Sequence, residues 1–190
     1  MTSLSLKHGT QNLHRSIDQH VLLRKLMSND LLLSDYKDTL CCLYHWHKSI
    51  ESCVYSEDVL QLGLRMQPKT PQILRDLQNI CSFAGNSDSP FVIDELNLVE
   101  KLGLIYVIEG ATMGGLILGP KIAKTLKRSD ITHYYSIYGT LTRENFAHNM
   151  KIIDKNICSP TQQKMCIKSA QWGFAMLASI LDEKLPKYVV

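Results

Sequence analysis

Apolar residues recur every three to four positions along most of this 190-residue chain, and this spacing limits what the chain can fold into. A period of 3.6 residues places such side chains on one face of an α-helix. The pattern predicts a first helix through residues 13–26, a second over 34–54 and a long one over 95–127. Only residues 131–138 (ITHYYSIY) resemble a strand, and they are equally compatible with a loop or a short helix. Because a single strand has no partner, we predict an all-α fold.

Local signals predict where further helices begin. Residues 70–71 (Thr-Pro) indicate a hydroxyl cap followed by a proline in the first turn. Thr142 can cap a helix that continues to residue 153. Residues 159–162 (SPTQ) form a capping-box pattern, which predicts a last helix to about Leu185. No repeat, low-complexity tract or linker divides the sequence, so we predict one domain over residues 1–190.

Composition narrows the classes of function. The 21 Lys and Arg residues exceed the 18 Asp and Glu residues by only +3, and the densest basic cluster, over 121–128, is typical of a solvated helix end. The six cysteines form no CxxC pair, so we interpret most of them as reduced core residues rather than zinc ligands. The longest apolar run, 102–108, is too short to span a bilayer, and residues 1–11 lack a signal peptide's apolar core. We therefore predict a cytoplasmic protein that neither binds nucleic acid nor inserts into a membrane.

Four polar residues share one face of the first predicted helix. At about 100° per residue they fall within a stripe roughly 80° wide. They are Lys7, Thr10, His14 and Asp18. A histidine can bind a metal through one ring nitrogen while a carboxylate one turn away fixes the tautomer through the other. The alternative is a polar helix edge in solvent. The remaining histidines show no metal-binding spacing, and we interpret His45 and His47, which flank Trp46, as surface or satisfied residues.

Glycines are concentrated in the long predicted helix, at positions 110, 114, 115 and 119. Each glycine inside a helix costs about 1 kcal/mol relative to alanine, so the concentration indicates a packing or functional role. Because Gly110 and Gly114 lie one turn apart, one helix face lacks side chains there, and another helix or a flat ligand can approach the backbone. Helix packing alone would explain this motif. A phosphate-binding loop is disfavoured because the segment GATMGG (110–115) has no lysine and follows no strand.

Taken together, the two segments resemble the haem oxygenase family. The similarity lies in LKHGTQNLHRSID (6–18) near the N-terminus and in YVIEGATMGGLIL (106–118). A weaker similarity, in YYSIYG (134–139) followed by Thr142 and Arg143, is to the bacterial enzymes associated with bacteriophytochromes. The resemblance implies an all-α haem-oxygenase-like domain with haem between the first helix and a glycine-kinked distal helix.

The resemblance also implies roles for individual residues. His14 falls on the axial iron ligand, Asp18 on the acidic residue that hydrogen-bonds it, and Lys7 on a base that meets a haem propionate. Gly110 and Gly114 fall on the distal glycines whose backbone lies over the haem. Further contacts with the cofactor are expected from Thr10, Gly115 and Arg143, with Lys151 as the alternative to Arg143 for the second propionate.

The activity that the resemblance implies is oxidative cleavage of haem to biliverdin, iron and carbon monoxide. Haem would be both cofactor and substrate, with O2 as co-substrate. Electrons would come from an external donor (a ferredoxin, a reductase or a small reductant), and a functional link to a phytochrome is expected. One position departs from the family: Ala111 stands where well-known members have an aspartate that orders the water supplying protons.

Two alternatives therefore stay open. A non-catalytic haem carrier or sensor on the same fold is compatible with Ala111, and a helical interaction module without haem would use the glycines for packing alone. A di-metal carboxylate enzyme is disfavoured because its Glu-x-x-His motifs are absent from the sequence.

Overall fold

Helices account for all the regular structure in the part of the chain that the computed structural model describes, residues 1–83, 85, 93 and 95–183. In chain order they are α1 (Thr2–Gln19), α2 (Val21–Lys25), α3 (Leu33–Val54), α4 (Glu57–Leu60), α5 (Thr70–Ile80), α6 (Leu98–Leu126), the 3-10 helix η1 (Gly139–Leu141), α7 (Thr142–Asn156) and α8 (Pro160–Asp182). The predicted all-α fold is confirmed.

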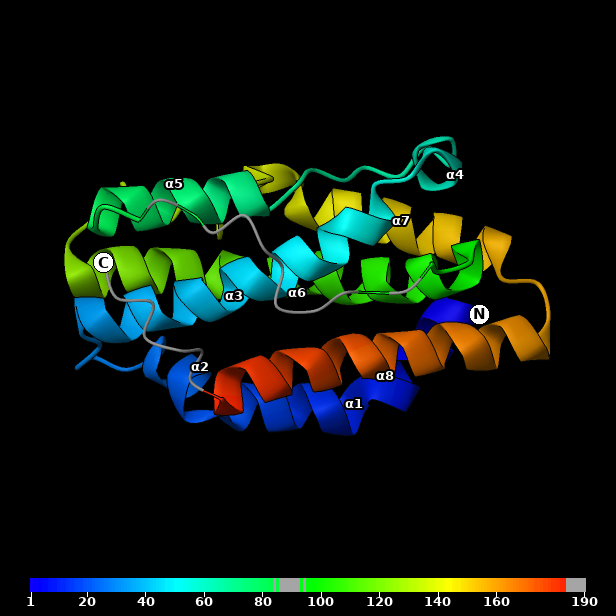
Figure 1. The fold of residues 1–190 in the computed structure, drawn as a ribbon, viewed down its shortest axis with the longest axis horizontal. Helices are drawn as coiled ribbons and strands as arrows, with labels where there is room; N and C mark the ends of the chain where they lie inside the picture. The colour runs from blue at the N-terminus through cyan, green and yellow to red at the C-terminus, as the bar shows by residue number, and fades with distance from the viewer. Residues whose placement is uncertain (84, 86–92, 94, 184–190) are drawn as a thin grey trace.

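The longer helices run roughly along one direction and form a layered bundle (Figure 1). In this view α5 and α7 lie uppermost, α3 and α6 in the middle, and α1 and α8 lowest. Helix α6 packs against α8, α7 and α3, and α8 also packs against α1. The most buried side chains of the core include Trp46 of α3, whose Nε1 donates to the carbonyl of Gly173 in α8 (2.9 Å).

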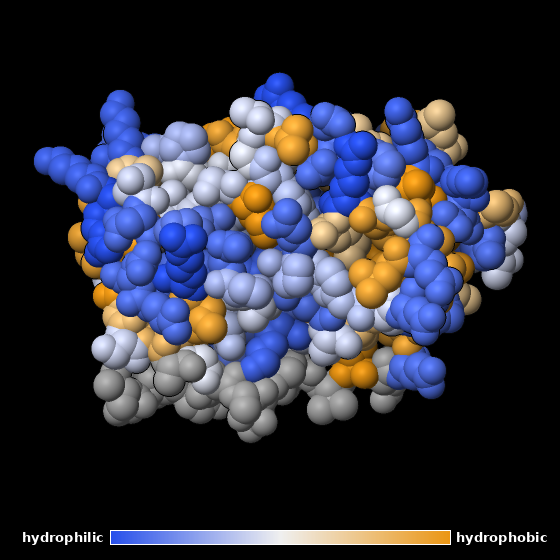
Figure 2. Space-filling model, turned by 90° about the horizontal axis from the view of Figure 1, so that it is seen from above, coloured by the Kyte–Doolittle hydropathy of each residue, from blue (hydrophilic) through white to orange (hydrophobic). Residues whose placement is uncertain are grey.

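Helix α6 is the longest helix and one of the most apolar. Its length and composition would allow it to cross a membrane. However, 56% of its most apolar 18-residue stretch is buried inside the bundle, as in the core helix of a globular protein. Figure 2 shows one outer face, on which hydrophilic residues predominate and apolar residues form small separate groups. The helix continues without interruption through the four glycines at positions 110, 114, 115 and 119.

Capping explains where two helices begin. Helix α6 starts at Leu98, three residues later than predicted, because Asn97 accepts from the Glu100 amide (3.1 Å) while Glu100 accepts from the Asn97 amide (3.0 Å). The predicted capping box of Ser159 and Gln162 at the start of α8 is confirmed. The expected end of that helix, Leu185, lies outside the described residues.

Three local predictions are wrong. The first helix ends at Gln19 because His20 is extended, and its Nδ1 accepts from the Leu22 amide (3.3 Å) to start α2. Thr70 and Thr142 are the first helical residues rather than caps. The hydroxyl of Thr142 donates to the carbonyl of Gly139 (2.8 Å), within η1.

Residues 131–138 form a series of turns, in agreement with the loop alternative. Asp76 of α5 fixes this segment. Its fully buried carboxylate accepts hydrogen bonds from the amides of His133 and Tyr134 (both 2.9 Å) and from Nδ1 of His133 (2.7 Å). The anchor brings Tyr134 and Tyr135 into the interior, where both are buried.

Candidate functional site

A cavity of about 720 Å³ lies between α1 and α6. Its volume is within the range of about 300–1,000 Å³ that is usual for small-molecule sites. Helix α1 contributes Lys7, Thr10, Gln11, His14, Arg15, Ile17 and Asp18; α6 contributes Tyr106, Val107, Gly110, Ala111, Met113, Gly114 and Leu118; and other segments contribute Leu23, Leu43, Trp46, Tyr134, Tyr135, Phe146, Phe174 and Leu177. The wall formed by α1 is mostly polar, and the rest is mostly apolar or aromatic.

The four residues of the predicted polar stripe all line this cavity. Within the stripe, His14 Nδ1 lies 2.9 Å from Asp18 Oδ2, and both side chains are more than half exposed. Because an ionised carboxylate only accepts, this pair places a proton on Nδ1 and leaves the lone pair of Nε2 free. Phe174 of α8 contacts the imidazole edge-on, with ring centroids 5.7 Å apart. The arrangement suits His14 to bind one metal ion through Nε2.

Two positive charges lie on the same wall. Lys7 and Arg15 both line the cavity, and neither forms an ion pair with another described residue. They are therefore available to an anionic ligand. Thr10 lines the cavity, as predicted. Its buried hydroxyl donates to the carbonyl of Leu6 (2.7 Å), so Thr10 forms part of the cavity wall but does not offer a free hydrogen-bond donor.

The glycines of α6 divide into two groups by what a side chain would meet. A Cβ atom at Gly110 would have only Phe146 within 4 Å (3.9 Å), and one at Gly114 only Leu118 (3.7 Å). These are ordinary contacts, so helix packing does not require glycine at either position. Both residues line the cavity, where they leave a strip of backbone without side chains.

Gly115 and Gly119 have the opposite surroundings. A Cβ at Gly115 would lie 2.4 Å from the carbonyl oxygen of Tyr135, and one at Gly119 would lie 3.2 Å from Tyr135 Cβ. Gly115 is buried and does not line the cavity. The predicted contact of Gly115 with the cofactor is therefore corrected: this glycine lets residues 131–138 pack against α6.

Ala111 lines the cavity, and the polar residues beside it in the sequence do not. Thr112 is buried and donates its hydroxyl to the carbonyl of Glu109 (2.6 Å). Glu109 is 1% exposed and forms an ion pair with the fully buried Lys69. Helix α6 thus presents no carboxylate to the cavity.

The predicted second base is not at the site. Arg143 lies in the first turn of α7, is exposed and does not line the cavity, and the same holds for Lys151 later in that helix. Phe146 is the residue of α7 that reaches the cavity. Arg15, one position after the predicted ligand histidine, is the second basic residue that lines the cavity.

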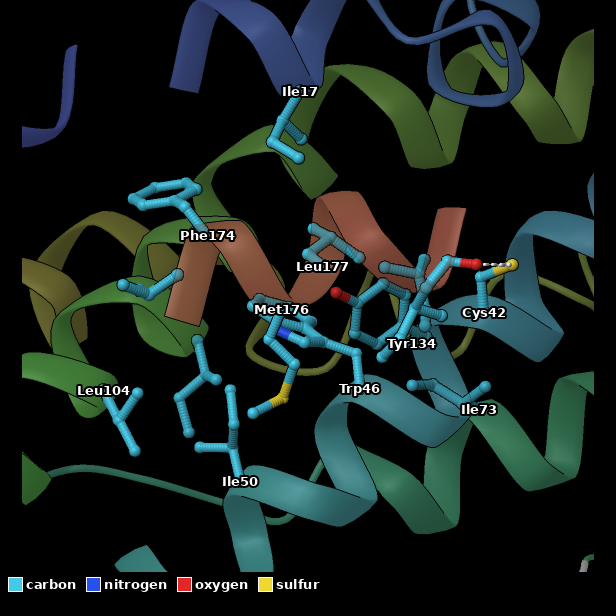
Figure 3. Packing of buried hydrophobic residues seen from close by; sticks show 14 of the residues in the cluster. Ile17, Cys42, Trp46, Ile50, Ile73, Leu104, Tyr134, Phe174, Met176 and Leu177 are labelled. Carbon is cyan, nitrogen blue, oxygen red and sulfur yellow. Dashed lines mark hydrogen bonds between the residues drawn. The ribbon is translucent and has the colours of Figure 1, made fainter. Parts of the chain in front are cut away.

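Sequence reasoning also missed the aromatic wall. Figure 3 shows Trp46, Tyr134 and Phe174, which line the cavity from α3, the 131–138 segment and α8. These segments are far apart in the sequence and share no local pattern, so no signal in the sequence alone could group them.

A buried polar cluster adjoins this wall. His47 is fully buried, its Nε2 lies 2.9 Å from the Tyr134 hydroxyl, and its Nδ1 has no hydrogen-bond partner in the described part of the chain. His45 is also buried with an unpartnered Nδ1, so the interpretation of these two residues as surface or satisfied is wrong. Burial lowers the pKa of His47 well below its ordinary value, which keeps the ring neutral.

The same cluster contains two acidic residues and a lysine. Glu51 accepts from the Lys69 amide (2.5 Å), and Lys69 Nζ bonds Glu109 and the Tyr138 hydroxyl (3.0 Å). Burial raises the pKa of both Glu51 and Glu109 and lowers the pKa of Lys69. Hydrogen bonds from Thr70 and the Lys69 amide partly offset the shift of Glu51, and the Lys69–Glu109 pair partly offsets the other two shifts. Over residues 1–83, 85, 93 and 95–183, no group of three or more His, Cys, Asp or Glu residues is arranged to hold a metal ion.

Comparison with known proteins gives structural matches. No family model matches the sequence, and no curated protein matches significantly. Among solved structures, the NO- and CO-bound haem oxygenase from Neisseria meningitidis superposes with a TM-score of 0.78 at 15% identity, over 97% of this chain and 92% of that one. Haem oxygenase from Leptospira interrogans gives a TM-score of 0.75 at 16% identity, over 96% and 98%. The chain therefore has the fold of the haem oxygenases.

Proposed function

We propose that this protein is a haem oxygenase, which cleaves haem to biliverdin, iron and carbon monoxide using O2 and electrons from an external donor. One observation carries the proposal. The His14–Asp18 pair of α1 and the strip of α6 without side chains at Gly110 and Gly114 line the same cavity.

The residues of the cavity fit haem. His14 offers one neutral nitrogen as an axial ligand, and Asp18 fixes its tautomer. The aromatic and apolar wall suits a flat macrocycle, and Lys7 and Arg15 suit its two carboxylates. When bound, haem supplies the iron that takes up O2 and the porphyrin that is cleaved.

The protein's own residues would then bind the haem, orient it and shield it. The glycine strip brings backbone rather than side chains to one face of the ligand, which leaves room for a small gas molecule. The two bases would set how the ring is seated. The sequence has no GxGxxG segment after a strand, so we propose a separate protein or a small reductant as the electron donor.

A non-catalytic haem carrier or sensor is the second candidate, and Ala111 favours it. Without a carboxylate on α6 facing the cavity, proton supply to bound oxygen needs another group. A module that binds no haem is less well supported, because Gly110 and Gly114 are not required for packing.

Turnover separates the two candidates. The hemin complex is mixed with ascorbate in air, with catalase present to remove free peroxide, and the reaction is repeated with a ferredoxin and its reductase. We expect the Soret band to decay while biliverdin and carbon monoxide form in equal amounts. A Soret band that persists with both reductants would leave the carrier or sensor.

Two finer predictions stay proposals. The similarity of residues 134–139 to the bacteriophytochrome-associated enzymes favours a role in supplying a phytochrome with its chromophore. A cytoplasmic location agrees with the buried position of α6 within the bundle.

A further inference from the structure

An imidazole and a thioether line the cavity from two different helices. Among the described residues of its wall, His14 of α1 carries the one imidazole and Met113 of α6 carries the one sulfur atom. The two helices lie in neighbouring layers of the bundle (Figure 1). A histidine nitrogen and a methionine sulfur together form the axial ligand pair of the c-type cytochromes. The cavity wall therefore contains both members of an axial ligand pair.

Helix geometry places Met113 at the edge of the strip of α6 that lacks side chains. Met113 lies three residues after Gly110 and one before Gly114, and it is about 60° from Gly110 around the helix axis. Long side chains in a helix lean towards its N-terminus, over the residues three and four positions earlier. This direction takes the Met113 side chain towards Gly110, where α6 has no side chain to obstruct it.

Core packing does not account for Met113. Its side chain is half-buried and lines the cavity, but it is not one of the apolar side chains that pack against the core. Met150 of α7 has the opposite surroundings: it is also half-buried, but it packs against the core and does not line the cavity. Because methionine is unbranched and has three rotatable bonds, Met113 can extend its sulfur into the cavity.

Tyr106 is the other residue of α6 on this wall whose side chain can bind iron. It lies four residues before Gly110, and the lean of helical side chains takes its hydroxyl away from the strip. Its ring lies towards Phe146 of α7, with ring centroids 6.5 Å apart. A phenol must also lose a proton to bind iron, whereas a thioether has no proton to lose. Met113 is therefore the better placed of the two.

We propose, on the basis of the haem binding through His14 proposed above, that Met113 is the second axial ligand of the ferric iron. The iron is then held by one nitrogen from α1 and one sulfur from α6. Because a thioether is a weak, neutral donor and Met113 is flexible, a small gas molecule that binds ferrous iron replaces it. This exchange breaks one iron–sulfur bond, forms one bond to the gas, and moves no proton or electron.

A thioether ligand also changes what the electron donor must do. A histidine–methionine pair raises the reduction potential of haem iron relative to a pair without the sulfur. Ferric iron then accepts one electron from a weaker donor, and ascorbate, which gives up one electron at a time, is such a donor. A small reductant is therefore sufficient to reduce haem in this cavity.

The test compares the hemin complexes of wild type, Met113→Leu and Met113→Ala, with Met150→Leu as the matched control. Leucine keeps nearly the volume of methionine and removes the sulfur, and alanine provides a second variant without sulfur. Absorption and EPR spectra of the ferric complexes report the axial ligands over a range of pH values. The reduction potential and the affinity of the ferrous complexes for CO are then measured.

We expect wild type and Met150→Leu to be low-spin and to show the far-red charge-transfer band of a bond between ferric iron and a thioether. Both Met113 variants should lose this band and show the pH-dependent spin change of a bound water that becomes hydroxide. Their reduction potentials should fall. CO should bind their ferrous forms at least about tenfold more tightly, because no thioether competes for the iron.

Ferric spectra of Met113→Leu and Met113→Ala that match wild type would overturn the proposal. Haem binding through His14 would still stand in that case if His14→Ala loses the wild-type Soret band. A wild-type Soret band that does not depend on His14 would overturn both. Formation of biliverdin does not enter this test, so its result is the same whether the protein is an oxygenase or a haem carrier.

Discussion

His14 Nδ1 lies 2.9 Å from Asp18 Oδ2, one helical turn away on α1, and both residues line the cavity. The carboxylate holds the ring in the tautomer whose Nε2 is free. Removing a residue that orients a metal ligand in this way typically costs about 10–100-fold in affinity. We therefore expect Asp18→Ala to weaken hemin binding by about that factor while the His14-ligated spectrum is kept.

The measurement is a hemin titration of Asp18→Ala beside Ser16→Ala, an exposed position on the same helix that does not line the cavity. Equal affinity in the two variants would show that Asp18 does not support the ligand histidine.

Gly110 and Gly115 should respond to alanine in opposite ways. A methyl group at Gly110 makes only one ordinary contact, so Gly110→Ala should stabilise the hemin-free protein by up to about 1 kcal/mol through helix propensity. A methyl group at Gly115 would overlap the Tyr135 carbonyl, so Gly115→Ala should destabilise it by about 1–3 kcal/mol.

Urea unfolding of both hemin-free variants measures the two effects. Hemin titration then completes the test, because the Gly110→Ala methyl group extends into the cavity and should weaken binding at least about tenfold. A destabilised Gly110→Ala protein with unchanged hemin affinity would show that this glycine serves packing alone.

Lys69 is the one cation of the buried cluster and should matter more at high pH than at low pH. Lys69→Met leaves the buried Glu109 with the Tyr138 hydroxyl but without its ion-pair partner, which should destabilise the protein by about 3–5 kcal/mol near pH 8. Burial already raises the pKa of Glu109 in the folded state, and loss of the ammonium raises it further. A carboxyl group with a raised folded-state pKa stabilises the fold below its unfolded pKa, and this contribution is lost as the pH rises towards the folded value.

The loss of unfolding free energy in Lys69→Met relative to wild type should therefore shrink as the pH falls from about 8, because Glu109 then binds a proton. Urea unfolding at several pH values measures it. The double variant Lys69→Met/Glu109→Gln removes the unpaired charge and should recover at least half of the loss at high pH. A loss of unfolding free energy that does not depend on pH would contradict the assignment of this effect to Glu109.

Local sequence signals predicted the longer helices and one wall of the site. The i, i+4 spacing of His14 and Asp18 places them together on any helix, so this pair could be found before the structure was known. The capping box at Ser159 is likewise a local feature. The break at His20 could not be predicted, because the apolar spacing continues across it. At the break, the His20 ring accepts the hydrogen bond from the Leu22 amide that starts α2.

Long-range packing decided the rest. The sequence could not separate Gly110 from Gly115, because the difference lies in where residues 131–138 pack against α6. It placed the second base at Arg143, whereas the start of α7 directs that residue to solvent and Arg15 lines the cavity. His47 became notable only when Tyr134, 87 positions away, was found at its ring.

The central claim, that this cavity binds haem through His14, is tested most directly by a hemin titration of wild type, His14→Ala and His8→Ala. His8 is an exposed histidine on the same helix that does not line the cavity. We predict that His8→Ala gives the wild-type Soret band and affinity, and that His14→Ala loses the histidine-ligated band and binds at least about tenfold more weakly. A wild-type Soret band and affinity in His14→Ala would contradict the claim.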